Sequence, residues 1–203
     1  MKIKYYLVLL VSVLFISCAG APKKGDVYLD LSLPVINHFH ISPQYEEVKN
    51  KLGFLGFAMG MDYYHANNQF INLGAAVITD FPLMIPVSLS PQTKGESEGF
   101  LAVHASISNN HIIGKFKLGY GLSYARNNWN YYNYDTDYSV QKEHNAFGFI
   151  FPAYFQATNF FNVGLIYLPT FFRPGISDPF LYEHLMSVNL AFKVPLYRKR
   201  NNF

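Results

Sequence analysis

The sequence predicts an all-β fold in which eight antiparallel strands close into an up-and-down barrel that crosses a membrane, preceded by a signal peptide. Apolar side chains recur at every second residue, which is the period of a β-strand with one apolar face. Only 14% of the 203 residues are charged and 50% are apolar, whereas roughly a quarter of a soluble domain is charged. The connections between apolar runs are alternately short and long, as in barrels that span membranes with strands.

The amino end has the pattern of an export signal. Lys2 and Lys4 precede an apolar run over residues 5–16, which has the length of a signal-peptide core and is too short for a spanning helix of about 20 residues. We therefore expect residues 1–17 to be a signal peptide.

The only cysteine of the chain, Cys18, directly follows this run in the segment FISC (15–18). This segment resembles the bacterial lipobox, and the resemblance implies cleavage before Cys18, lipidation of its thiol and a short tether over 18–25. The alternative is ordinary cleavage after AGA (19–21). A single cysteine also excludes an internal disulfide.

Eight alternating runs follow, each near the length of a tilted transmembrane strand. The first four runs place on one face, in order, Val27, Leu29 and Leu31; Leu55, Phe57 and Met59; Ile71, Leu73 and Val77; Leu101, Val103 and Ile107. The last four place there Phe116, Leu118 and Leu122; Phe147, Phe149 and Phe151; Val163, Leu165 and Tyr167; Val188, Leu190 and Phe192. The predicted barrel covers residues 26–197, and a basic tail follows over 198–203.

The connections predict how the barrel is oriented. Short asparagine-rich turns are expected at 65–69, 109–112 and 158–159, and long polar loops at 42–51, 88–99, 127–145 and 173–184. Outer-membrane barrels have short periplasmic turns and long extracellular loops. An even number of strands then leaves both termini in the periplasm.

The side chains on the two faces of the runs differ in volume, and this difference indicates which face contacts lipid. The non-apolar face is mostly glycine, alanine, serine and asparagine, which suits a narrow lumen. The bulky face exceeds what one lumen can hold, so we expect it to face hydrocarbon. The alternative, a soluble periplasmic barrel of the lipocalin type that binds a lipid, would need solvated charges outside.

On these patterns, residues 26–197 resemble the small eight-stranded outer-membrane barrels, such as OmpX and the membrane domain of OmpA. The resemblance implies an outer-membrane location, contact with its lipids, and folding by the barrel-assembly machinery, which reads a terminal aromatic such as Tyr197 or Phe203. It implies no cofactor. A net charge of +3 gives no reason to expect nucleic-acid binding.

Charged residues on the lumen face are the first candidate site. These are Asp30, Asp62, Lys115, Lys117 and Lys193. Buried charges must pair, so we expect an ion-pair network that plugs the lumen; a proton or ion path is the alternative. Because side chains fill an eight-stranded lumen, no open pore is expected.

Histidines and a glutamate at the predicted outer mouth form a second candidate. His38 and His40 are expected to point inward, near Glu183 and His184. The group is predicted to be a polar cluster at the mouth, and a transition-metal site is the alternative.

The segment His104-Ala105-Ser106 raises the question of catalysis. It matches the His-x-Ser fragment of the outer-membrane lipid A deacylase family known as PagL, in which the pair faces lipid. Here the alternation turns His104 and Ser106 into the lumen, and no downstream glutamate is placed to orient the histidine. A lipid A-modifying hydrolase therefore stays an alternative, and no catalytic residue is assigned.

The loop at 127–145 is rich in aromatic side chains. They are Trp129, Tyr131, Tyr132, Tyr134 and Tyr138. Such residues can contact an extracellular glycan or protein, or they can extend the strands above the membrane and cover each other. The expected function is an envelope-structural or surface-binding role.

Overall fold

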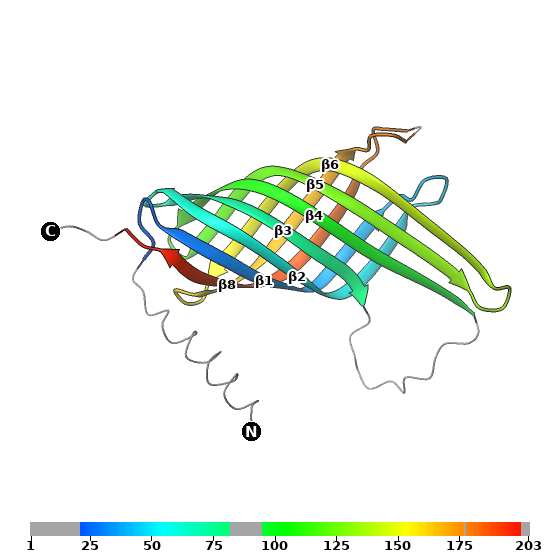
Figure 1. Cartoon of the computed structure of the whole chain (residues 1–203), viewed down its shortest axis with the longest axis horizontal. Helices are drawn as coiled ribbons and strands as arrows, with labels where there is room; N and C mark the ends of the chain where they lie inside the picture. The colour runs from blue at the N-terminus through cyan, green and yellow to red at the C-terminus, as the bar shows by residue number, and fades with distance from the viewer. Residues whose placement is uncertain (1–20, 82–94, 177, 200–203) are drawn as a thin grey trace, which may run out of the picture.

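The computed structural model describes residues 21–81, 95–176 and 178–199, which form eight β-strands. In chain order they are β1 Val27–Ile41, β2 Lys49–Ala66, β3 Gln69–Phe81, β4 Glu96–Ile113, β5 Phe116–Asn133, β6 Tyr138–Gln156, β7 Phe161–Phe172 and β8 Glu183–Tyr197. Consecutive strands pair antiparallel, and β1 pairs with β8 to close the barrel (Figure 1). None of the described residues belongs to a helix long and apolar enough to cross a membrane. The predicted all-β up-and-down barrel is confirmed; residues 1–17 and Cys18 lie outside the described residues.

The bulky apolar residues line the exterior of the barrel. On β4, Leu101 and Val103 are 40% and 41% exposed, whereas Ala102 and His104 between and beside them are 1% and 6% exposed. The same alternation along all eight strands produces an apolar exterior far larger than the patches that soluble monomers expose. The soluble lipocalin-like alternative, which needs this face inside, is contradicted.

Two irregularities change which residues of β1 and β2 face inward. The pairing of β1 with β8 shifts between Pro34 and Ile36, and that of β2 with β3 shifts between Phe54 and Gly56. Between the latter two, Leu55 has φ +67°, the left-handed region found at bulges. An extra residue moves the alternation by one. The inward side chains of β1 are therefore even-numbered up to Pro34 and odd-numbered from Asn37 onward.

The connections at one rim are short. Gln69 follows Ala66 after two residues, and Phe116 follows Ile113 after two residues, with Gly114 at φ +62°. The turn predicted at 109–112 is wrong, because β4 continues through it to Ile113. The turn was predicted from the two asparagines, but the backbone of Asn109 and Asn110 pairs with β3 and β5.

The rim opposite carries a long hairpin. The predicted loop 127–145 is mostly strand, because β5 runs to Asn133 and β6 begins at Tyr138. Figure 1 shows this hairpin at the far end of the barrel from the start of β1 and the end of β8.

Asp26 connects the segment before β1 to the segment after β8. It is 2% exposed and accepts hydrogen bonds from the backbone N–H groups of Lys23 and Lys199, each at 3.0 Å.

Candidate functional site

The inner part of the lumen holds a charged triad built by three neighbouring strands. Lys193 of β8 contacts Asp30 of β1 and Asp62 of β2, and both Nζ–Oδ2 distances are 2.6 Å. The amide of Asn72 donates to Asp62 at 2.7 Å. Asp30 lies directly opposite Lys193 in the β1–β8 pairing, so the closure of the barrel is what creates the contact. Sequence reasoning placed these three charges together correctly.

The two remaining predicted lumen lysines have different surroundings. Lys117 is inward-facing and 3% exposed, but its ammonium donates to the neutral amide oxygen of Asn162 at 3.0 Å. Lys115 was predicted to face the lumen, which is wrong. It is an exposed residue of the turn between β4 and β5, because β5 begins one residue later, at Phe116.

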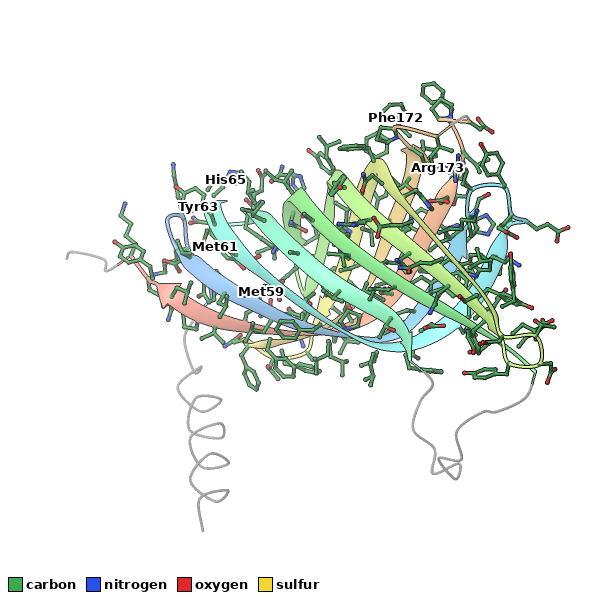
Figure 2. The ribbon with its side chains drawn as sticks, turned by 45° about the vertical axis from the view of Figure 1, so that its right-hand side comes forward. Met59, Met61, Tyr63, His65, Phe172 and Arg173 are labelled. Atoms are coloured by element: carbon green, nitrogen blue, oxygen red, sulfur yellow. The ribbon has the colours of Figure 1, made fainter. Side chains whose placement is uncertain are left out.

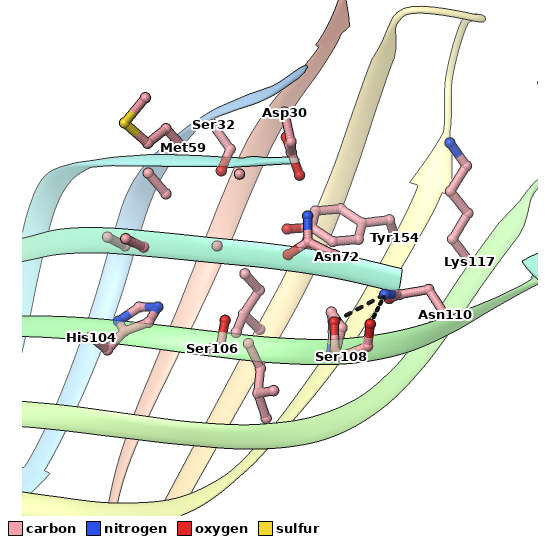
Figure 3. Close-up of a pocket in the computed structure, with 18 of the residues that line it drawn as sticks. Asp30, Ser32, Met59, Asn72, His104, Ser106, Ser108, Asn110, Lys117 and Tyr154 are labelled. Atoms are coloured by element: carbon pink, nitrogen blue, oxygen red, sulfur yellow. Dashed lines mark hydrogen bonds between the residues drawn. The ribbon is translucent and has the colours of Figure 1, made fainter. Parts of the chain in front are cut away.

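The lumen beside the charged triad is closed. A cavity of about 50 Å³ is lined by polar side chains of β4 together with Asp30, Lys117 and Lys193 (Figure 3). It has room for a few water molecules, at about 10–15 Å³ of such volume per molecule. Tyr28, Tyr64 and Phe70 pack together in one lumen cluster. The other cluster fills the lumen with the buried side chains of Phe39, Ile41, Ala76, Ile78, Phe100, Ala102, Trp129, Ile150, Tyr154, Ile166, Leu168, Leu185 and Ala191.

His104 and Ser106 both point into this cavity, as their positions on β4 predict (Figure 3). They are 6% and 8% exposed. Among the described residues, no carboxylate hydrogen-bonds to His104. His104 and Ser106 thus face the closed lumen, whereas the matching pair of the deacylase family faces lipid.

The outer part of the lumen holds a second network centred on Glu183. Its Oε1 accepts from the Ser42 backbone N–H at 2.8 Å and from Arg173 at 3.2 Å. Its Oε2 contacts Asn127 at 3.1 Å and His144 Nε2 at 2.8 Å. The side chains of Glu183, Arg173, Asn127 and His144 are all nearly buried. Arg173 also donates to the Ser42 carbonyl at 2.6 Å.

Sequence reasoning placed Glu183 at the mouth and missed Arg173 and Asn127. Arg173 follows the last strand residue of β7 and lies in a segment predicted to be a solvated loop. A lone arginine next to an apolar run was the only signal of its burial.

The predicted inward position of His38 and His40 is wrong. The β1 irregularity turns both outward, where their rings stack against His184 with centroid distances of 5.4 and 4.8 Å. Glu183 is on the opposite, inner side of the same wall. The predicted cluster is thus divided by the barrel wall, and the described residues contain no group of three or more side chains placed to hold a metal ion.

The aromatic residues of the β5–β6 hairpin divide between its two sides. Trp129 is 3% exposed inside the outer lumen and stacks with Tyr131 at 6.2 Å. Tyr138 is 57% exposed and makes an edge contact with Tyr131 at 6.5 Å, whereas Tyr132 and Tyr134 make an edge contact at 4.5 Å on the other side. Each of the five side chains thus contacts another aromatic ring of the hairpin, as in the alternative in which they extend the strands and cover each other. Tyr132, Tyr134 and Tyr138 remain available for contacts outside the barrel.

No protein-family model matches the chain, and no curated protein matches it. Among solved structures, the crystal structure of Ail, the attachment invasion locus protein of Yersinia pestis, is similar with a TM-score of 0.55 at 10% identity, covering 84% of this chain and 98% of that chain. Ail in complex with the heparin analogue sucrose octasulfate gives 0.54 at 10% identity with the same coverage. The crystal structure of Neisserial surface protein A gives 0.47 at 10% identity, covering 83% and 96%. At this identity the likeness concerns the fold alone. The chain has the fold of the small eight-stranded outer-membrane β-barrels.

Proposed function

We propose that the chain is a bacterial outer-membrane protein that conducts no solute and binds an extracellular protein through its β5–β6 hairpin. The apolar exterior supports the membrane location, since a closed barrel satisfies the backbone in hydrocarbon. The signal-like segment 1–17 supports export, with folding by the barrel-assembly machinery. Short turns and both termini then lie in the periplasm, and the hairpin lies outside the cell.

Lipidation of Cys18 belongs to the same proposal. It would anchor the amino end in the periplasmic leaflet beside the rim where β1 begins. Incorporation of labelled palmitate that is lost in Cys18→Ser is the expected result, and equal labelling of the variant would contradict it.

The observation that carries the binding role is an unpaired strand edge. The pairing of β6 with β7 starts at Phe147, so residues 138–146 pair only with β5 among the described residues. At about 3.4 Å per residue this edge is roughly 30 Å long. Unpaired backbone N–H and C=O groups in a row are a template for an added strand. The exposed Tyr138 at its tip adds a large contact surface.

Charge at this rim favours a protein over a polyanionic glycan. The heparin analogue bound by Ail is a polyanion, which a dense patch of free cations would attract. Here Lys49 pairs with Glu98 at 3.3 Å and Lys51 with Asp80 at 2.7 Å. Arg126 likewise pairs with Glu143 at 2.5 Å. These pairs neutralise the rim locally, whereas strand addition needs no net charge.

The test is a shortened hairpin. Asn128 and Glu143 already face each other in the pairing, so residues 129–142 can be replaced by Asn-Gly, a two-residue hairpin turn, which removes more than half of the unpaired edge. Cells displaying the shortened chain should lose binding to cultured epithelial monolayers by about tenfold, at equal surface amounts. The control combines Tyr132→Ser and Tyr134→Ser, which keeps the edge and should retain most binding. Unchanged binding by the shortened variant would refute the role.

A further inference from the structure

One region of the lipid-facing exterior combines an apolar groove with polar side chains. The groove has a volume of 620 Å³ and crosses four strands, from Ile71 of β3 over Ile107 and Leu122 to Phe149 and Phe151 of β6. Asn109 and Tyr120 line the same groove. They lie opposite each other in the β4–β5 pairing, on the side of the groove nearer the short turns.

A hydrogen-bonded patch continues from the groove toward the short-turn rim. His65 Nε2 lies 3.1 Å from Asn109 Oδ1, and Asn109 Nδ2 lies 3.5 Å from His111 Nε2. The ring of His111 stacks on that of Tyr120 at 5.9 Å. Figure 2 shows His65 at the rim end of the outward row that begins with Met59 and Met61. The patch thus joins polar side chains of β2, β4 and β5 across β3.

The hydrogen bonds fix which atoms of the patch can still donate. The Asn109 amide oxygen can only accept, so His65 Nε2 carries a proton; the Asn109 amide nitrogen can only donate, so His111 Nε2 accepts. A neutral His111 then carries its proton on Nδ1. That N–H and the Tyr120 hydroxyl are donors suited to an anionic oxygen.

We propose that this surface binds one phospholipid of the periplasmic leaflet, with an acyl chain in the groove and its phosphate against His111 and Tyr120. The apolar groove and the donor patch share Asn109 and Tyr120, so one amphiphile can occupy both. Short turns mark the periplasmic rim, and the patch lies between the groove and that rim. Lipid A, which belongs to the opposite leaflet, would have its phosphates at the wrong end of the groove. The inference rests on the membrane location proposed above.

The experiment measures phospholipid retained by the purified, folded full chain. The chain is loaded with phosphatidylethanolamine, washed in mild detergent and analysed by native mass spectrometry. Ile107→Trp fills the groove, and Val103→Trp is its control on the same strand and face, outside the groove. Asn109→Leu breaks the patch, and Asn145→Leu is its control, an outward asparagine that accepts from Tyr124 at 2.8 Å near the other rim. Tyr120→Phe removes one donor with minimal effect on folding.

Retention should fall about tenfold in Ile107→Trp and Asn109→Leu, severalfold in Tyr120→Phe, and remain unchanged in both controls. Wild-type protein should retain diacylglycerol, which lacks the phosphate, about tenfold less than phosphatidylethanolamine. Equal loss in Ile107→Trp and Val103→Trp, equal retention of diacylglycerol, or preferred retention of lipid A would overturn the proposal. Failure of the membrane location is a separate result, since the chain would then be extracted without detergent.

Discussion

Replacing Lys193 with methionine tests whether the lumen triad stabilises the barrel. The change keeps the length of the side chain and removes the ammonium that both Asp30 and Asp62 contact at 2.6 Å. Asp62 is 0% exposed and Asp30 8%, so neither carboxylate reaches bulk solvent. Removing one partner of a buried ion pair costs about 3–5 kcal/mol. We expect a loss near the middle of this range, about 4 kcal/mol, or roughly a thousandfold in the folding equilibrium.

The rest of the triad offers matched comparisons. The triple variant that adds Asp30→Asn and Asp62→Asn removes all the charges, so its stability should return to within about 1 kcal/mol of wild type. Lys117→Met removes an equally buried ammonium that contacts only a neutral amide, and should cost about 1 kcal/mol or less.

Denaturant unfolding in lipid vesicles measures these differences. The chain has one tryptophan, and Trp129 is 3% exposed in the outer lumen, so its fluorescence reports opening of the barrel far from the substitutions. Migration of unheated and boiled samples on a gel confirms folding. Equal losses in Lys193→Met and Lys117→Met, or no recovery in the triple variant, would refute the account of the triad.

Four further outcomes follow from the structure. Gly148→Ala should destabilise the barrel by about 3 kcal/mol or more, because its Cβ would lie 2.0 Å from a backbone oxygen of β7; unfolding midpoints equal to wild type would contradict the packing. Val77→Arg, on the exterior at 46% exposure, should cost about 2–4 kcal/mol in bilayers, and its effect should vanish if that face were not in lipid. Glu183→Ala should cost about 3 kcal/mol without producing channels in planar bilayers, because the apolar lumen cluster remains; steady single-channel currents would show that the network is the only seal. Burial and the hydrogen bond between the Tyr182 and Tyr167 hydroxyls, in which Tyr182 donates, raise the pKa of Tyr182 to about 12. This contact stabilises the loop fully below pH 10 and is lost as pH rises through 12; the absorbance titration of tyrosinate should lose its step near pH 12 in Tyr182→Phe.

Which residues of a strand share a face could be predicted from the sequence, since it depends on local backbone geometry. A strand has a period of two, so Leu101, Val103 and Ile107 share a face because β4 has no irregularity between them. The Asp30–Lys193 contact was also predictable, because an even number of strands closed in sequence order brings the first strand against the last. The prediction of a turn at 109–112 was wrong because asparagine favours turns but can also occupy a strand, where its backbone pairs with the neighbouring strands.

The alternation, the number of strands and the outward apolar face were determined by the sequence by itself, because each follows from residues close together in the chain. Only the tertiary structure decided that His38 and His40 face outward, that Arg173 and Asn127 meet Glu183, and that β6 has an unpaired edge. An irregularity moves the phase of a strand by one residue without a local sequence signal. Partners across a lumen depend on the stagger of strands far apart in the chain, which the closure of the whole barrel sets.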